Sequence, residues 1–205
     1  MGLYAERLLP KIINNACGRS ELAPLRRRVC AGLAGDVVEI GFGSGHNVPF
    51  YPAEVASVTA VEPAGKAWEL ANERVRASTV PVQLAAPDGQ QLPFPDDRFD
   101  AALTTFTLCT IPDADAALTE LRRVIKPGGT LHFVEHGLAP DESVRRWQRR
   151  LEPVTKRVMG GCHLTRPTVR LMQNAGFTIA EVEAFYQPNV PKFDGFLSLG
   201  VAVAP

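Results

Sequence analysis

Long hydrophobic runs are missing from this sequence, and cysteine and tryptophan are scarce. No apolar stretch approaches the ~20 residues that a membrane-spanning helix needs, and the N-terminus has no signal-peptide apolar core, so we expect no bilayer crossing. The four cysteines are too scattered for zinc-like pairs or for a disulfide framework. Their pattern favours a reducing cytoplasm and predicts no metal site.

Neither sign of charge is in excess. The chain has 22 basic and 22 acidic residues, so no bulk electrostatic field would draw it to nucleic acid, and we expect no nucleic-acid partner. A length of 205 residues suits one domain with one substantial core. We predict an N-terminal helical cap over residues 1–34 and one α/β unit over residues 35–205. The composition leaves the oligomeric state open.

Three glycines on alternate positions follow the first apolar run of this unit. Gly41, Gly43 and Gly45 predict a tight turn after a buried strand, because glycine adopts positive φ and lets a ligand approach the backbone. A helix opening near His46 or Asn47 would point free N–H groups at that ligand. The dinucleotide fingerprint requires glycine at the sixth position from Gly41, which here is His46. The turn therefore favours a nucleotide-like ligand and argues against a nicotinamide dehydrogenase.

An acidic residue lies in or just after each of the first three predicted strands. Glu39 lies inside the first strand, where a carboxylate is costly unless it holds something polar. Glu62 ends the second apolar strand, some twenty residues after the glycine turn, where a carboxylate can bind both hydroxyls of a ribose. Asp88 follows the third strand and precedes Gly89, a pair that is also a common turn former.

Hydrophobic periodicity predicts alternating strands and helices along the rest of the chain. Arginines 26–28 are predicted to form a solvated helix face, with a phosphate-binding patch as the alternative. Thr165 is a candidate N-cap. The predicted strands cover residues 37–40, 57–62, 80–86, 101–106, 130–135, 177–185 and 196–203, and the predicted helices include two within 1–34, one at 113–126 and one at 141–158.

Three motifs together resemble the class I S-adenosylmethionine-dependent methyltransferases. They are the acid-x-Gly-x-Gly-x-Gly run at 39–45, Leu-Pro-Phe with an acidic turn and Phe-Asp at 92–100, and Leu-Arg-Arg-Val-Ile-Lys-Pro-Gly-Gly at 121–129. The segment that begins with Glu-His-Gly at 135–137 is similar to phosphatidylethanolamine N-methyltransferase-like proteins and small thiol methyltransferases. It is also related to the quinone C-methyltransferases.

The resemblance implies a fold, a cofactor and a set of site residues. The fold would be a Rossmann-like, seven-stranded, mostly parallel sheet with an antiparallel last strand and helices on both faces. The resemblance implies S-adenosylmethionine as cofactor, bound by Glu39, Gly41, Gly43, Gly45, Asn47, Glu62, Pro63, Asp88, Gly89 and Thr105. The acceptor side would include Tyr4, Thr107, Cys109 and Cys162.

Methyl transfer from a sulfonium is an in-line displacement, so the protein mainly aligns the acceptor and excludes water. His136 and His163 are the candidate catalytic bases, although a lone histidine is more often structural. We expect a small, fairly apolar acceptor, with a thiol or a lipid amine favoured. The alternatives are methyl transfer to a quinol, a phenol or another small molecule, and a cofactor-binding regulator without turnover.

The helix predicted at 141–158 has two interpretations. Its apolar residues favour packing on the sheet with the arginines in water. Arginines beside tryptophan and aliphatic residues are also typical of a helix that lies on a lipid surface, which would add peripheral membrane contact to a cytoplasmic enzyme.

Overall fold

The computed structural model describes residues 8–86 and 88–205, so Tyr4 lies outside the described residues. The helices are α1 (Leu9–Cys17), α2 (Ala23–Cys30), α3 (Gly65–Arg76), α4 (Ala114–Val124), α5 (Glu142–Val158), α6 (Thr168–Asn174) and α7 (Lys192–Gly195), with 3₁₀ turns η2 (Ser20–Leu22) and η3 (Val48–Phe50). The strands are β1 (Gly35–Ile40), β2 (Val55–Val61), β3 (Val82–Ala86), β4 (Phe99–Thr105), β5 (Ile125–His136), β6 (Thr178–Tyr186) and β7 (Phe196–Val203).

One seven-stranded sheet organises the molecule. The strand order is β3-β2-β1-β4-β5-β7-β6, and the neighbours from β3 to β5 run parallel. Strand β7 alone is antiparallel, to both β5 and β6. The short connection from β6 to β7 allows an antiparallel pair, whereas parallel neighbours need a longer crossover. The predicted seven-stranded, mostly parallel sheet is confirmed.

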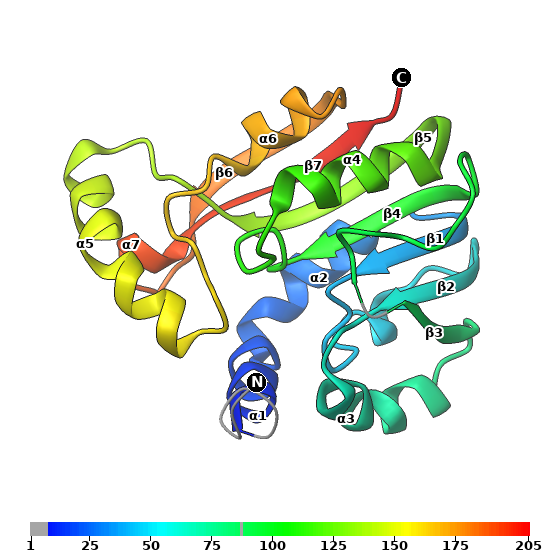
Figure 1. Ribbon diagram of the computed structural model, residues 1–205. Helices are drawn as coiled ribbons and strands as arrows, with labels where there is room; N and C mark the ends of the chain where they lie inside the picture. Colours follow the sequence, from blue (N-terminus) through cyan, green and yellow to red (C-terminus); the bar gives the residue numbers. More distant parts are fainter. Residues whose placement is uncertain (1–7, 87) are drawn as a thin grey trace.

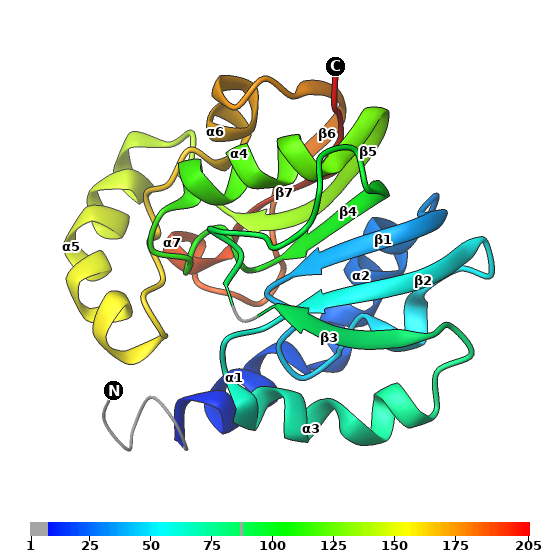
Figure 2. The same cartoon turned by 45° about the vertical axis from the view of Figure 1, so that its right-hand side comes forward.

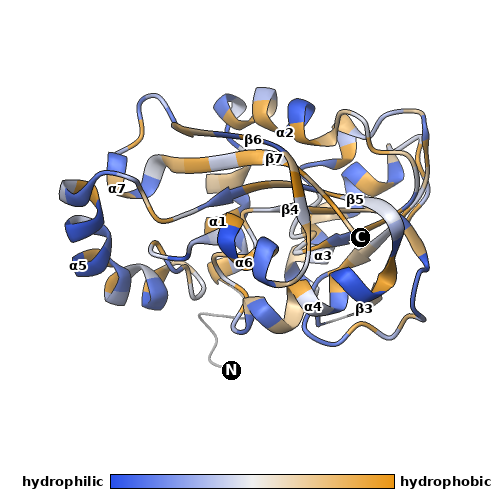
Figure 3. Ribbon diagram, turned by 90° about the horizontal axis from the view of Figure 1, so that it is seen from above, coloured by the Kyte–Doolittle hydropathy of each residue, from blue (hydrophilic) through white to orange (hydrophobic). Residues whose placement is uncertain are grey.

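Helices cover both faces of the sheet (Figure 1). Helices α4 and α6 pack on one face, where the core includes Ile40, Leu121, Phe133 and Met172. Helices α2 and α3 cover the other face. Figure 3 shows hydrophobic colours along the central strands and hydrophilic colours over much of α5. Because α2 buries Leu25 and Val29 in the second core, this N-terminal helix is packed into the same domain as the sheet.

Several element boundaries differ from the predicted ones. The predicted helix at 113–126 ends two residues earlier, and Ile125 already pairs with Phe99 in the sheet. Pro-Gly-Gly at 127–129 is a bend within β5, held by the Gly128 N–H donating to Ala204 O at 2.8 Å. Only η3 follows the glycine turn, so the predicted helix near Asn47 does not form as a regular α-helix. Thr165 does not cap α6, which starts at Thr168.

Helix α5 does not pack on the sheet, and that prediction is wrong. It packs against α7 and stands apart from the strands (Figure 1). In Figure 2 the arrowheads of β1 to β4 point to one edge, and α1 and α5 lie off this edge. Open α/β sheets bind ligands at the carboxyl ends of their parallel strands. No helix among the described residues is long and apolar enough to cross a membrane.

Candidate active site

The glycine turn lies at the carboxyl end of β1. Gly41, Gly43 and Gly45 have φ values of 68°, 57° and 72°, which only glycine adopts readily. A Cβ on Gly41 would overlap the side chain of Thr107, so this glycine lets the turn pack against the loop after β4. A Cβ on Gly43 would meet nothing closer than 3.8 Å, which leaves the backbone there open to a ligand.

Glu62 joins the glycine turn to the end of β2. Its Oε2 accepts a 2.7 Å hydrogen bond from the Gly43 N–H, and its Oε1 accepts a 2.8 Å bond from the Ala64 N–H. Burial raises the pKa of this carboxyl, and the two backbone donors oppose that rise. Each oxygen keeps a further lone pair for a ligand hydroxyl. Pro63 follows it and is exposed.

Glu39 is fully buried below the turn and belongs to a polar network. The Asn47 Nδ2 donates to Glu39 Oε1 at 3.0 Å and to Thr105 Oγ1 at 3.0 Å. The Tyr51 hydroxyl donates to the other Glu39 oxygen. Burial raises the pKa of Glu39 to about 7, against the opposing effect of these donors. Asn47 and Thr105, both predicted site residues, therefore meet near the ends of β1 and β4. Tyr51 joins them, although the sequence did not indicate it.

Arg26 is the largest departure from the predicted site. It was predicted on a solvated face, but it is only 5% exposed, while its neighbours Arg27 and Arg28 are exposed. Its guanidinium donates to Asn47 Oδ1 at 2.7 Å and to Cys17 O at 3.0 Å. Among residues 8–86 and 88–205, no carboxylate oxygen lies within ion-pair distance of it. A buried cation without a direct counter-ion is costly and suits an anionic ligand.

The sequence does carry a signal for this burial. Arg26 lies four residues after Leu22 and four before Cys30, within the same helical stripe as Leu25 and Val29. A charged residue at this spacing faces the core side of its helix, whereas Arg27 and Arg28 face water. The burial of Arg26 lowers its pKa.

Phe106 contacts both the buried cation and the histidine at the end of β5. The guanidinium carbon of Arg26 lies 5.8 Å from the Phe106 ring centroid, and the His136 ring lies 5.4 Å away, edge to face. Phe106 has a φ of 55°, an uncommon value for a bulky residue. Such strain clusters at functional sites. No sequence signal marks this residue.

His136 faces a carboxylate from α7. Its Nδ1 is buried and lies 3.7 Å from Asp194 Oδ1, too far for a hydrogen bond. Burial lowers the pKa of His136, and the Asp194 charge opposes that shift. Sequence reasoning missed Asp194, because only the fold brings α7 beside the end of β5.

Glu135 anchors the loop that follows β4. Its Oε1 accepts hydrogen bonds from Thr104 Oγ1 at 2.7 Å and from the Thr107 N–H at 3.0 Å. The carboxyl is fully buried, which raises its pKa to about 7. Thr107, a predicted acceptor-side residue, is thereby fixed between Glu135 and the glycine turn.

Cys109 and Cys162 pack together in a small apolar cluster with Leu164. The Cys162 side chain and burial raise the pKa of Cys109, which suits packing rather than nucleophilic attack. The backbone N–H of His163 donates to Cys109 O at 2.7 Å. The ring Nδ1 of His163 lies 3.5 Å from Glu152 Oε1. No hydrogen bond or ion pair of the described residues joins His163 to His136.

Asp88 forms a local turn. Its Oδ1 accepts from the Gln90 N–H at 2.9 Å and from the Gln90 side chain at 3.0 Å, and its carboxylate is exposed. Gly89 is buried, and a Cβ there would come within 3.3 Å of Ile111. No hydrogen bond links Asp88 to Glu62 or to the glycine turn within the part of the chain that the structure describes.

The fold and the site together define a Rossmann-like protein that binds an adenosine-type cofactor. An open glycine backbone, a strand-end carboxylate and a buried arginine would match an amino-acid-bearing nucleoside. Residues 38–133 match the family model described as a methyltransferase domain. The chain belongs to the S-adenosylmethionine-dependent methyltransferases, and S-adenosylmethionine is its cofactor.

Three similar proteins illustrate the relationship. The chain is 35% identical over 157 residues to the thiol S-methyltransferase TMT1B of Rattus norvegicus, with 74% of this chain and 63% of that protein covered. It is 33% identical over 116 residues to the phosphatidylethanolamine N-methyltransferase of Cereibacter sphaeroides, covering 54% and 57% of the two chains. A solved SAM-dependent methyltransferase from Thermotoga maritima superposes with a TM-score of 0.67 at 22% identity, over 98% of each chain. The match thus spans less than two thirds of the length of these curated relatives.

Proposed function

We propose that this protein transfers the methyl group of S-adenosylmethionine to a small, fairly apolar acceptor, a thiol or a lipid amine. The observation that carries the proposal is the buried Arg26, Asn47 and Glu39 network beside the open glycine turn. The names of the two curated relatives, one acting on thiols and one on a lipid amine, support these acceptor classes. A cytoplasmic setting is proposed because the chain's four cysteines are free thiols.

The cofactor would be held at three places. Arg26 would bind the carboxylate of its methionine part, since the guanidinium is buried and lacks a carboxylate partner among the described side chains. Glu62 would accept the ribose hydroxyls, and Asp88 with Gly89 would border the adenine. The remaining proposed contacts are Glu39, Gly41, Gly43, Gly45, Asn47, Pro63 and Thr105. When bound, S-adenosylmethionine supplies an electrophilic methyl group on a sulfonium.

The acceptor would enter beside Phe106, between the Arg26 guanidinium and His136. His136 would take the proton that a thiol or an ammonium group must lose before its lone pair can attack. The negative charge of Asp194, 3.7 Å from Nδ1, would stabilise the imidazolium that forms. Thr107, Cys109 and Cys162 would form the packed wall of the acceptor site. His163 would stand near the entrance.

A methyl-transfer screen with radiolabelled cofactor tests the acceptor class. Small aryl and alkyl thiols, phosphatidylethanolamine and reduced quinones are offered to the wild-type protein and to His136→Gln. We expect label in a thiol or in the lipid amine, and a strong loss in the variant. Label in quinols alone would overturn the acceptor assignment. Tight binding of S-adenosylhomocysteine without transfer to any acceptor would indicate a cofactor-binding regulator.

A pH profile tests the proposed base. Asp194→Asn removes the negative charge that raises the pKa of His136, so the acidic limb of kcat should move to lower pH. Glu181→Gln, on the exposed surface of β6, is the matched charge control. An unchanged limb in Asp194→Asn would remove His136 as the group that titrates.

A further inference from the structure

Helix α5 exposes an apolar stripe. Trp147, Val154 and Val158 are 55%, 56% and 45% exposed. At about 100° of rotation per residue, these three side chains fall within about 40° of one another around the helix. The residues that α5 buries, Val144 and Gln148, lie to one side of them. We call these three residues the α5 stripe; large apolar side chains gathered at about half exposure mark a candidate docking surface.

Three arginines follow the outer border of the α5 stripe. They project about 60° to 100° around the helix axis from the centre of the stripe, on the side away from the buried residues. These arginines are Arg146, Arg150 and Arg157. Within residues 8–86 and 88–205, none of them forms an ion pair. The guanidinium carbon of Arg150 lies 5.8 Å from the Trp147 ring centroid. Uncompensated positive charge therefore borders the apolar stripe.

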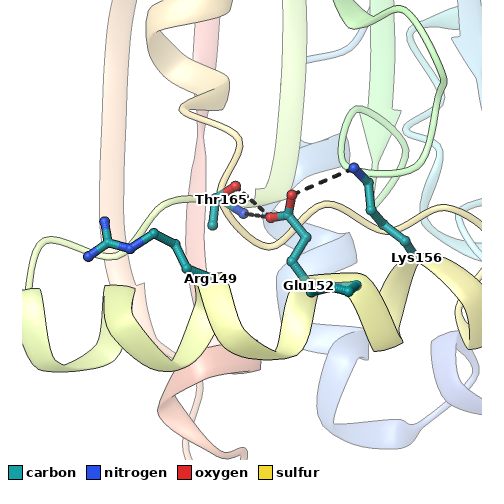
Figure 4. Close-up of a pocket in the computed structure, with 5 residues that line it drawn as sticks. Arg149, Glu152, Lys156 and Thr165 are labelled. Carbon is teal, nitrogen blue, oxygen red and sulfur yellow. Dashed lines mark hydrogen bonds and ion pairs between the residues drawn. The ribbon is translucent and has the colours of Figure 1, made fainter.

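The opposite side of α5 has its charges compensated. Arg145 and Arg149 pair with Glu142 at 3.2 and 2.7 Å, and Lys156 lies 3.8 Å from Glu152. Figure 4 shows this side, where Glu152 points between Thr165 and Lys156 in a hollow of about 280 Å³. The two sides thus differ in net charge although both carry basic residues. This asymmetry favours an anionic surface as the partner of the stripe side.

The stripe ends close to the candidate active site. A Cβ on Gly160 would lie 3.3 Å from Leu9, so the end of α5 meets α1. Leu8, just before α1, and Lys11 and Ile12 within it are exposed, the same mixture of apolar and basic residues. A Cβ on Gly161 would lie 3.1 Å from Thr110 O in the loop after β4. A surface in contact with α5 would thus lie beside the loop proposed to receive the acceptor.

We infer that the α5 stripe docks this protein on an anionic lipid surface. Trp147, Val154 and Val158 enter the boundary between headgroups and acyl chains, as apolar faces of interfacial helices do. Arg146 and its two companions on the border contact the anionic headgroups. The inference does not depend on which acceptor is methylated, because it concerns binding and not turnover.

Vesicle co-sedimentation with the full chain tests the charge component. We expect binding to phosphatidylcholine vesicles that contain phosphatidylglycerol, little binding to phosphatidylcholine alone, and loss of binding at high salt. The triple variant Arg146→Gln/Arg150→Gln/Arg157→Gln should weaken binding by about 100-fold, because each arginine near such a surface contributes about a factor of five. The control Arg145→Gln/Arg149→Gln/Lys156→Gln removes the same charge from the compensated side and should retain most of the binding. An equal loss of vesicle binding in the two triple variants would overturn the inference. So would a wild-type protein that does not sediment with anionic vesicles.

Tryptophan fluorescence tests the apolar component. In a Trp68→Phe background, Trp147 is the single tryptophan, and its emission should shift to shorter wavelength on anionic vesicles. Trp147→Ala should weaken vesicle binding by about tenfold, the scale for burying one large side chain. Unchanged emission in the presence of sedimenting vesicles would contradict the inference. A shift without vesicles that depends on protein concentration would assign the stripe to a second copy of the chain and would also overturn it.

Discussion

Replacing Arg26 by methionine separates binding of the cofactor's amino-acid part from binding of its nucleoside. Methionine fills most of the volume of the arginine stem but donates no hydrogen bond. Arg26 is 5% exposed and already donates to Asn47 Oδ1 and Cys17 O, so its guanidinium is preorganised before any ligand arrives. A hydrogen bond to a charged group contributes about 1.5–3 kcal/mol. We therefore expect Arg26→Met to weaken S-adenosylhomocysteine binding by about 2–3 kcal/mol, or about 30- to 150-fold in Kd.

The assay is titration calorimetry with two ligands. S-adenosylhomocysteine carries the amino acid, whereas methylthioadenosine keeps the nucleoside and lacks the carboxylate. Arg26→Met should weaken the first and leave the second within a few-fold of wild type. Arg26→Lys should recover part of the loss, since it restores the charge without the two-pronged geometry.

The exposed neighbour Arg27 supplies the matched control. Arg27→Met removes the same charge from the same helix but should change neither affinity. The Arg26 variant also leaves Asn47 Oδ1 and Cys17 O without that donor, so its folding is checked by thermal denaturation. Equal weakening of both ligands by Arg26→Met in a folded protein would refute the carboxylate assignment. Unchanged affinity for S-adenosylhomocysteine would refute it as well.

Three further outcomes follow from the same site. Glu62→Ala should weaken S-adenosylmethionine binding by about 1–3 kcal/mol in calorimetry, the scale for lost charged hydrogen bonds, and unchanged affinity would remove the ribose assignment. Gly41→Ala should abolish cofactor binding and lower the melting temperature, because its positive φ and the overlap with Thr107 both oppose a side chain; normal binding would show that the turn rearranges freely. Burial raises the pKa of both Glu39 and Glu135 from 4.5 to about 7, so the folded state favours their protonated forms. The free energy of unfolding of the ligand-free protein should therefore fall as the pH rises from 4.5 to 7, measured by urea denaturation; Glu39→Gln should flatten this dependence, and an unchanged slope would contradict it.

Features that depend on local rules were predictable from the sequence. The alternation of strands and helices favours an α/β fold, and the seven-stranded sheet is what the family resemblance implies. The glycine turn follows from residues that adopt positive φ readily. Glu62 was placed by its distance along the chain from that turn, and the structure brings it to Gly43. These inferences need only neighbours in sequence and the geometry of one βαβ unit.

Features that depend on tertiary contacts were not predictable in the same way. The helical stripe that Arg26 shares with Leu25 and Val29 indicates its burial, but its hydrogen-bond partners Asn47 and Cys17 are known only from the fold. Asp194 reaches His136 only because β7 pairs with β5 and carries α7 to that edge. Thr165 has the residue type of an N-cap but instead donates its hydroxyl to Glu152 at 2.5 Å. In each case a partner distant in sequence decided the role of the side chain.

A crystal structure with S-adenosylhomocysteine tests the central claim most directly. The account predicts ligand density across the carboxyl ends of β1 and β2, with the amino-acid carboxylate against Arg26 and the ribose hydroxyls on Glu62. Density elsewhere on the molecule, with this edge of the sheet left empty, would contradict it.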